Sequence, residues 1–327
     1  MGGRAQDQTT ASALSSSLVS AFNALNGGHI APCLPGKCIG FMVQYLMRLS
    51  FDTPTPLGYF TTLVQSDEQF PLLEAAATLA QDEYPELDVQ QVLGDMDQLL
   101  ARLKRRLPAD AAPLQRLRLL NQFFYRDLSF AGNVNNFYDP DNSYLNAVLK
   151  KRKGIPISLA VLWMELAQGI GLQARGIGFP GHFLVKVTLP RGQVVIDPMN
   201  GQSLGREDLS ERLEPFKLRS GLVDDFDVPL GLYLQAETPR NIIARMLRNL
   251  KEVYRAQSDW HRLVSVLDRL IVLLPEAWGE YRDRGLALAE QGLTREALLD
   301  LEIYLTQARD ALDVDAIAER VANMRLA

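Results

Sequence analysis

Apolar residues recur at helical spacing between residues 55 and 127 of the chain. The pattern predicts several helices from Thr55 to about Arg106, separated by prolines, and a further helix from about Pro113 to Asp127. The stretch from Ile157 to about Gln168 is apolar almost all round, which predicts a helix that is buried on every side. Pro156 suits the first turn of that helix because a first-turn residue needs no amide donor.

Short β-rich runs follow this helix and predict strands. They cover Leu172–Phe179, Phe183–Leu189 and Val194–Ile196, with a turn over Pro190–Gly192. A hairpin folded near Pro190 brings His182 and Asp197 to about the same level. A turn centred on Arg191 and Gly192 instead places Asp197 nearer Lys186, so both registers stay open.

The chain after residue 237 is helical throughout and contains an internal repeat. Thr238 and Pro239 suit a helix start, as a cap and a first-turn proline. Two units are offset by 34 residues, with Leu250, Tyr254, Trp260, Leu263, Leu267 and Pro275 in the first and Arg284, Gly285, Leu288, Thr294, Ala297, Leu301 and Tyr304 in the second. The period and the small residues resemble tetratricopeptide repeats. Since two units rarely stand alone, we expect them to dock on the preceding domain or on a helix from Arg240 to Lys251.

Length and composition indicate a globular chain with two domains. The chain has 327 residues, of which 47% are hydrophobic and 22% charged. No apolar run approaches the roughly 20 residues of a membrane span. Cys33 and Cys38 are the only cysteines, which excludes a disulfide framework as the main source of stability.

The charge of the chain argues against nucleic acid as its principal ligand. The formal net charge is -5, whereas proteins that bind phosphate backbones usually concentrate positive charge. The cluster Lys150–Lys153 is the longest basic run. This cluster either forms a solvated turn or attracts an anionic partner. Short basic runs more often form solvated turns.

Ser158, His182 and Asp197 follow one another in the order nucleophile, base and orienting carboxylate. Ser158 lies in the first turn of the predicted buried helix, with Glu165 on about the same side seven residues later. A thiol gains from a helix start because the dipole favours the thiolate, but a hydroxyl needs a base to remove its proton. His182 is alternatively a structural histidine, and Asp197 a residue of a strand-end turn. One His and one Asp without further ligand spacing do not make a metal site, so we expect no metal and no cofactor.

The polar segment from Gly132 to Ser143 permits two interpretations. Asn142 or Ser143 would cap the short helix that follows, which is the usual role of such residues. The segment would otherwise form one wall of a cleft, because polar loops often carry sites. In that case the wall residues are Asn136, Tyr138, Asp139, Asn142 and, from the buried helix, Glu165.

Three motifs resemble one bacterial family. They are Gly-Ile-Pro-Ile-Ser-Leu-Ala-Val-Leu from Gly154, Gly-Ile-Gly-Phe-Pro-Gly-His-Phe-Leu-Val-Lys from Gly176 and Ile-Asp-Pro-Met-Asn-Gly from Ile196, and Asp-Pro-Asp-Asn-Ser-Tyr-Leu-Asn from Asp139 fits as well. The chain is similar from about residue 47 onward to SirB-one-type proteins of the transglutaminase-like superfamily. The resemblance implies a Cys-His-Asp triad on a papain-like helix and antiparallel sheet. Ser158 stands at the cysteine position, His182 at the histidine and Asp197 at the aspartate.

We therefore expect an α+β fold with two domains. A papain/transglutaminase-like helical and antiparallel-sheet domain is followed by an all-α tetratricopeptide-repeat domain. The expected boundaries are a disordered or non-native extension over 1–46, the transglutaminase-like domain over 47–202, an irregular connector over 203–237 and repeat helices over 238–327.

Three functions compete at this point. The serine at the thiol position and the repeat pair favour a non-catalytic domain that acts as a cytoplasmic protein-interaction adaptor. The alternatives are a hydrolase or acyltransferase that uses Ser158, His182 and Asp197, and a ligand or peptide pocket without chemistry. The expected partner is a protein or peptide bound by the C-terminal repeats, with neither nucleic acid nor a membrane.

Overall fold

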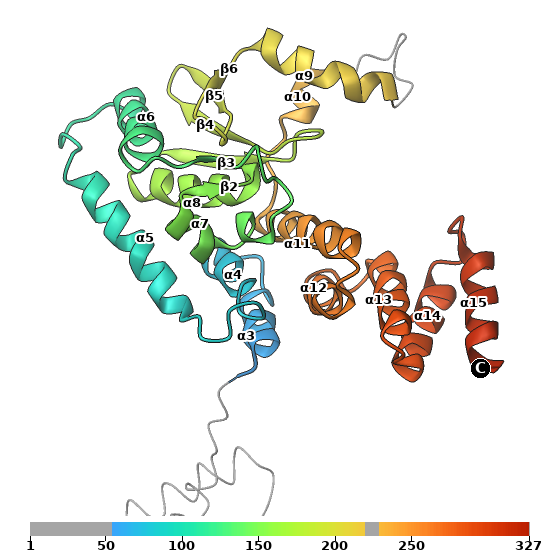
Figure 1. Ribbon diagram of the computed structural model, residues 1–327. Helices are drawn as coiled ribbons and strands as arrows, with labels where there is room; N and C mark the ends of the chain where they lie inside the picture. The colour runs from blue at the N-terminus through green and yellow to red at the C-terminus, as the bar shows by residue number, and fades with distance from the viewer. Residues whose placement is uncertain (1–53, 220–228, 327) are drawn as a thin grey trace, which may run out of the picture. The chain divides into compact units, whose positions relative to one another are not determined.

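The computed structural model describes residues 54–219 and 229–326 (Figure 1). The predicted extension over 1–46 lies outside the described residues. The elements before the sheet are α3 (Pro56–Leu63), α4 (Leu72–Thr78), α5 (Val89–Lys104), α6 (Pro113–Asn121), the π-helix η1 (Gln122–Asp127), β1 (Ala131–Gly132), the short 3-10 helix η2 (Pro140–Asn142), α7 (Leu145–Lys151), β2 (Lys153–Gly154) and α8 (Pro156–Gly169).

The sheet strands are β3 (Gln173–Ile177), β4 (Leu184–Leu189), β5 (Gly192–Ile196) and β6 (Ser203–Leu204). The helices that follow are α9 (Arg206–Arg219), α10 (Leu230–Tyr233), α11 (Pro239–Ala256), α12 (Trp260–Leu273), α13 (Trp278–Glu290), α14 (Thr294–Gln307) and α15 (Val314–Leu326). Within the described residues, none of the helices has the length and apolar character needed to cross a membrane.

Helix α8 is buried around its whole circumference, as the sequence predicts. Every residue from Pro156 to Met164 is buried, and only Glu165 interrupts the run before Leu166 and Ala167. The helix packs against β3 and β4 on one side and against α4, α5, α7 and α11 on others. It ends at Gly169, and Gly171 follows in the left-handed region with a φ of 78°, a conformation that glycine adopts without steric cost.

The four-stranded sheet is antiparallel in the order β3-β4-β5-β6. In the β4–β5 hairpin, Leu189 pairs with Gly192 and Val185 with Ile196. Continuing this register places Asp197 opposite Leu184, which is two residues after His182. A register centred on Arg191 and Gly192 would have placed Asp197 opposite Lys186, farther from His182. The hairpin therefore brings the ends of both strands to the same edge.

The segment predicted as an irregular connector is helical over much of its length. Residues 206–219 form α9, and α10 follows, so the prediction of irregular structure is wrong there. Leu209 and Leu213 of α9 are buried in a second core with Ile177, Leu184 and Val195, and Leu230 and Tyr233 of α10 pack against this core. Pro215 lies inside α9, and the burial of Leu209 and Leu213 against the sheet stabilises the helix.

The repeat helices form the contacts that the sequence predicts. The side chain of Thr238 caps α11 by accepting from the amide of Asn241, and Pro239 occupies the first turn. Helices α13 and α14 approach closely at Gly285, where a Cβ would lie 2.8 Å from Cγ of Leu301 and 3.0 Å from the carbonyl oxygen of Ala297. The absence of a side chain at Gly285 therefore sets the spacing of this helix pair.

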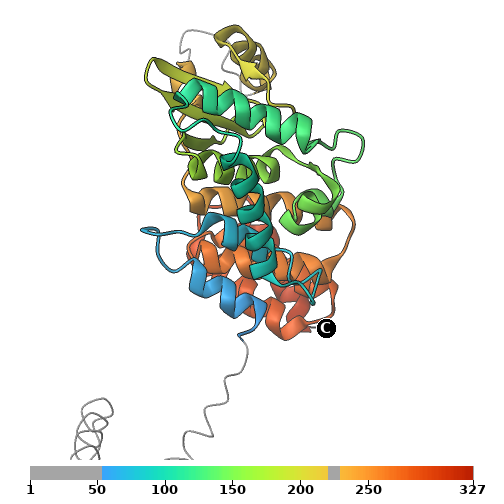
Figure 2. The same ribbon diagram turned by 90° about the vertical axis from the view of Figure 1, so that its left-hand side faces the viewer.

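The helices from α11 onward dock on the α+β part. Helix α11 packs against α4 and α8, and α12 packs against α3 (Figures 1 and 2). One continuous hydrophobic core runs from Phe60 of α3 to Ala287 of α13. At this junction the hydroxyls of Tyr144 and Tyr254 lie 2.5 Å apart. The first repeat helices are therefore part of the main core.

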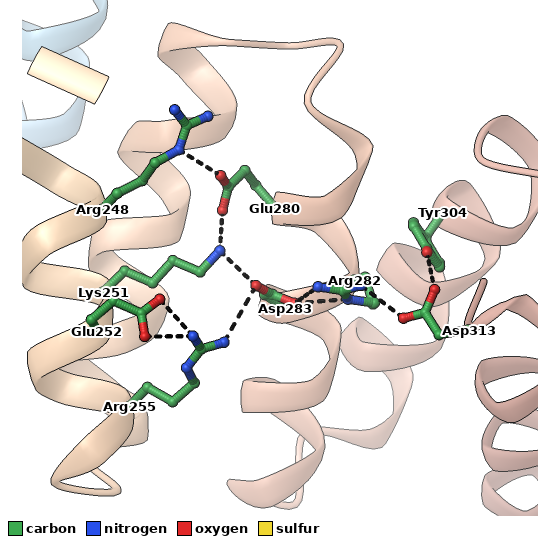
Figure 3. Close-up of polar contacts among 9 residues, drawn as sticks. All are labelled: Arg248, Lys251, Glu252, Arg255, Glu280, Arg282, Asp283, Tyr304 and Asp313. Carbon is green, nitrogen blue, oxygen red and sulfur yellow. Dashed lines mark hydrogen bonds and ion pairs between the residues drawn. The ribbon is translucent and has the colours of Figure 1, made fainter. Parts of the chain in front are cut away.

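A buried ion-pair network joins α11 to α13 (Figure 3). The ammonium of Lys251 contacts Glu280 and lies 2.5 Å from a carboxylate oxygen of Asp283, with a side chain only 10% exposed. Arg282 pairs with Asp283 and, at 2.7 Å, with Asp313, whose second oxygen accepts from the Tyr304 hydroxyl. Carboxylates thus surround the buried cation, which satisfies the requirement for burying a charge.

Lys251→Met should destabilise the protein by about 3 kcal/mol, because it removes the buried cation that Glu280 and Asp283 share. Arg325→Met is the control outside the network, since Arg325 is exposed on α15 and its surface pair with Glu302 is worth less than about 1 kcal/mol. Urea denaturation followed by circular dichroism measures both. Equal losses in the two variants would contradict a stabilising role for the buried pair.

Candidate functional site

His182 and Asp197 are in direct contact at the edge of the sheet. Nε2 of His182 lies 3.0 Å from Oδ1 of Asp197, so Nε2–H donates a hydrogen bond to the ionised carboxylate and Nδ1 is the other ring nitrogen. The His182 side chain is 21% exposed and that of Asp197 only 6%. His182 comes from the loop between β3 and β4, and Asp197 directly follows β5.

Two further donors bind the Asp197 carboxylate. The amide of Met199 donates to Oδ1 at 2.9 Å, and Nη1 of Arg212 lies 2.9 Å from Oδ2. Burial acts to raise the pKa of Asp197, but the hydrogen bonds from His182, the Met199 amide and Arg212 lower that pKa to about 2. The carboxylate is therefore ionised at neutral pH.

Arg212 is a site residue that the sequence did not reveal. It lies on α9, in the segment that the sequence predicted to be irregular, and no motif marks it. Tyr125 also lies nearby, since its hydroxyl donates to the carbonyl of Pro198 at 3.2 Å, and burial followed by the charge of Asp197 raises the pKa of Tyr125. No local sequence pattern predicts that Arg212 and Tyr125 lie at this site, because both contacts join residues far apart in the chain.

Ser158 is completely buried, and its hydroxyl donates to backbone carbonyls. Its Oγ lies 2.5 Å from the carbonyl oxygen of Asn142 and 3.1 Å from that of Ile155. Among the described residues, no hydrogen bond joins Ser158 to His182. The structure thus pairs Ser158 with the loop before α7, and His182 with Asp197.

The polar loop lies between these two pairs. Its first amide, Gly132, donates to the carbonyl of Met199 at 2.9 Å, and the Asn133 amide donates to the carbonyl of Gly154 at 2.9 Å. Asn142 is buried and binds the loop from within, because its side-chain nitrogen donates to the carbonyl of Asn136 at 2.6 Å. The loop therefore connects the start of α8 to the turn after β5.

The capping role expected of Asn142 or Ser143 is not observed. Tyr144 precedes α7 without a side-chain cap, and Asp139 caps η2 by accepting from the amide of Asp141 at 3.0 Å. The expectation was wrong because the side chain of Asn142 satisfies loop carbonyls instead. Asn136 is exposed and donates to Asp139 at 3.1 Å.

The remaining residues proposed for the cleft wall differ in their surroundings. Tyr138 is 72% exposed beside Phe137, and their rings form an edge-to-face pair. Glu165 is half-buried on α8, where burial and then the charge of Asp97 on α5 raise its pKa. The effect of Asp97 shows that Glu165 faces α5. Ser158 instead contacts the loop before α7, so the two side chains have different neighbours.

The site has no metal-binding character within the part of the chain that the structure describes. No group of three or more His, Cys, Asp or Glu side chains gathers there. The chemistry available is a histidine oriented by a buried carboxylate, whereas the serine at the start of α8 donates its hydrogen bond to backbone carbonyls.

Comparison with known proteins assigns the chain to a family. Residues 90–248 match the transglutaminase-like superfamily and residues 250–322 match a tetratricopeptide repeat. A UPF0162 protein of Xylella fastidiosa strain Temecula1 is 36% identical over 259 residues, which cover 79% of this chain and 91% of that protein. The chain belongs to the UPF0162 family.

More distant UPF0162 relatives occur in other bacteria. A relative from Pseudomonas aeruginosa is 26% identical and covers 77% of this chain and 90% of its own. The UPF0162 protein YchA of Escherichia coli K12 is 26% identical and covers 71% of this chain and 83% of its own. The predicted fold class, a transglutaminase-like domain followed by tetratricopeptide repeats, is confirmed for this UPF0162 chain.

The Asp197 carboxylate should make stability depend on acid pH. Its pKa is about 2 in the folded protein against an ordinary value of 3.8, so its hydrogen bonds stabilise the fold above about pH 4 and are lost as pH falls toward 2. Asp197→Asn should remove about 2 kcal/mol at pH 7 and flatten the pH profile in that range. Thermal unfolding between pH 7 and pH 2 measures this, with Asp110→Asn at an exposed position as control. An unchanged profile in Asp197→Asn would contradict the assignment.

Proposed function

We propose that the protein is a non-catalytic transglutaminase-like domain joined to a repeat domain, and that it acts as a protein-interaction adaptor. The observation that carries the proposal is the state of Ser158. A nucleophile must reach both a base and a substrate, but this hydroxyl is fully buried and donates its proton to carbonyl oxygens. Carbonyl oxygens do not accept that proton as a base.

The repeat helices support a binding role. Ala316, Glu319, Arg320, Asn323 and Met324 line an open hollow on one face of α15. Arg320 also reaches Glu290 of α13 at 2.7 Å, so the two helices share this surface. Repeat arrays of this kind present such faces to extended peptide segments.

A serine-dependent hydrolase or acyltransferase that uses Ser158, His182 and Asp197 is the second candidate. The hydrogen bond between His182 and Asp197 favours it, because that pair is two-thirds of a hydrolase triad. Backbone amides at the start of α8 would supply an oxyanion site. A cleft that binds a ligand or peptide without chemistry is a third possibility that uses the same residues.

The finer family resemblance and the location are part of the same proposal. The motifs around Ser158, His182 and Asp197 support a relation to SirB-one-type proteins. The cytoplasm is the location that the sequence led us to expect. Fractionation of cells that produce the full chain tests the location.

The purified protein should not react with a fluorophosphonate probe. The parent, Ser158→Ala and His182→Ala would be compared by in-gel fluorescence after prolonged incubation. Labelling of the parent that disappears in both variants would contradict the non-catalytic proposal and establish an activated serine.

A thiol at position 158 gives an independent measure of access. In a chain with Cys33 and Cys38 replaced by serine, Ser158→Cys should react with a disulfide reagent about 100-fold more slowly than Ser66→Cys, because the buried site must open first. Ser66 lies exposed on a loop and serves as the matched control. Equal rates would mean that the position is open to substrates.

The hollow on α15 should contact a partner protein. A photo-crosslinking residue at Asn323 should yield a discrete crosslinked species in cells that produce the chain, and the same residue at Leu299 should not. Leu299 is exposed on α14 and lies outside the hollow. Identical crosslinking patterns at the two positions, or none at Asn323, would contradict recognition by this face.

A further inference from the structure

Positive charge is concentrated in two short segments of an otherwise acidic chain. Residues 102–126 contain seven basic residues and one acidic residue, and residues 150–153 are all basic, although the whole chain carries a net charge of -5. Each basic run begins in the last turn of a helix, α5 in one case and α7 in the other. Cations are favourable near a helix C-terminus, which explains why each run follows a helix. It does not explain why the fold brings the two runs close together.

The fold brings the two runs together over one group of aromatic rings. The guanidinium carbons of Arg102 and Arg106 lie 5.8 and 5.1 Å from the ring centre of Phe123. That of Arg152 lies 4.6 Å from the ring centre of Phe130. Phe123 lies in η1, and Phe130 lies three residues after the end of that helix. The amide of the next residue, Ala131, donates to the carbonyl of Arg152 at 3.0 Å.

The rings continue as one layer beneath these arginines. Phe124, next to Phe123, stacks on Phe130 with 4.3 Å between ring centres. Arg126 lies exposed in the last turn of η1, beside Asp127, which pairs with Arg106. We call Arg102, Arg106 and Arg152 the arginine patch, and we include Arg126 because it is next in the chain to Asp127, the partner of Arg106. Arg102 lies in the last turn of α5, and Figure 2 shows the side of the molecule formed by α5 and α6.

Carboxylates compensate this charge only in part. Asp127 pairs with Arg106, and Asp95 acts on Arg152 from a distance. Neither Arg102 nor Arg126 has an ion pair within residues 54–219 and 229–326. Burial and then the charge of Arg102 lower the pKa of Arg152, and one terminal nitrogen of Arg152 is buried without a hydrogen-bond partner in the same residues. An anionic group bound here would relieve the repulsion between the guanidinium groups.

We propose that the arginine patch docks a carboxylate-rich, acidic segment of a partner protein. Planar guanidinium groups bind carboxylates through two parallel hydrogen bonds, so neighbouring arginines suit successive Asp or Glu side chains. This surface lies outside the repeat helices, so its use does not depend on the hollow on α15.

The details of the patch favour a protein over a nucleic acid. Phe123 and Phe130 are each only 1% exposed and lie beneath guanidinium groups, so the patch has no free ring on which a base would stack. The net charge of -5 opposes the approach of a long phosphate backbone. A short acidic segment needs to contact only the patch.

The test uses the full chain and a fluorescein-labelled peptide of 12 residues that alternates Glu and Ser. Fluorescence anisotropy measures the Kd of the parent, of Arg102→Glu/Arg126→Glu and of Lys104→Glu/Arg118→Glu. The second double variant has the same change in charge, at exposed positions outside the patch. Melting curves establish that each variant folds, and Arg102→Gln is a milder alternative if the first variant does not.

We expect at least tenfold weaker binding in Arg102→Glu/Arg126→Glu and less than a threefold change in Lys104→Glu/Arg118→Glu. The same peptide with Gln in place of Glu should not bind. Absence of peptide binding by the parent, or equal loss in both double variants, would overturn the proposal. Binding of a 12-nucleotide RNA by the parent without binding of the acidic peptide would overturn it as well and assign the patch to nucleic acid.

Discussion

The burial of α8 on every side is the constraint on which the rest of the structure depends. A helix without a polar face needs neighbours all round, and the sheet, the N-terminal helices and α11 supply them. Helices α11 and α12 therefore share the core of the α+β part and are not separated from it by a linker. Because β3 and β4 pack against this helix and His182 lies in the loop between them, the same packing positions the histidine of the candidate site.

This constraint also determines what a serine at the start of α8 can do. A buried hydroxyl without a partner is costly, so it must donate to whatever acceptor lies closest. The carbonyls of Asn142 and Ile155 meet that need for Ser158. At the position where an exposed thiolate would be reactive, the serine hydroxyl therefore links α8 to the polar loop by a hydrogen bond. His182 and Asp197 form a separate hydrogen bond with each other.

Charge is treated differently in three places of the same molecule. Lys251 is buried but surrounded by carboxylates, and Asp197 is buried but receives three donors. Both satisfy the rule that buried charges are paired. The arginines over Phe123 and Phe130 differ, because Arg102 and Arg106 are exposed and only one ion pair, between Asp127 and Arg106, reaches these arginines within the described residues. This excess of positive charge distinguishes the arginine patch from the ion pairs that stabilise the fold.

Elements with local signals can be predicted from the amino-acid sequence. The all-apolar run of α8, the start of α11 at Thr238 and Pro239, and the small residue at Gly285 are read from periodicity, capping and side-chain size. For His182 and Asp197 the sequence left two registers open, and the β4–β5 pairing decided between them. Only the tertiary structure decided which distant groups come together: Arg212 with Asp197, Ser158 with the carbonyl of Asn142, and Arg102 with Arg152. Periodicity states which side of an element is buried, whereas these contacts depend on how elements far apart in the chain pack.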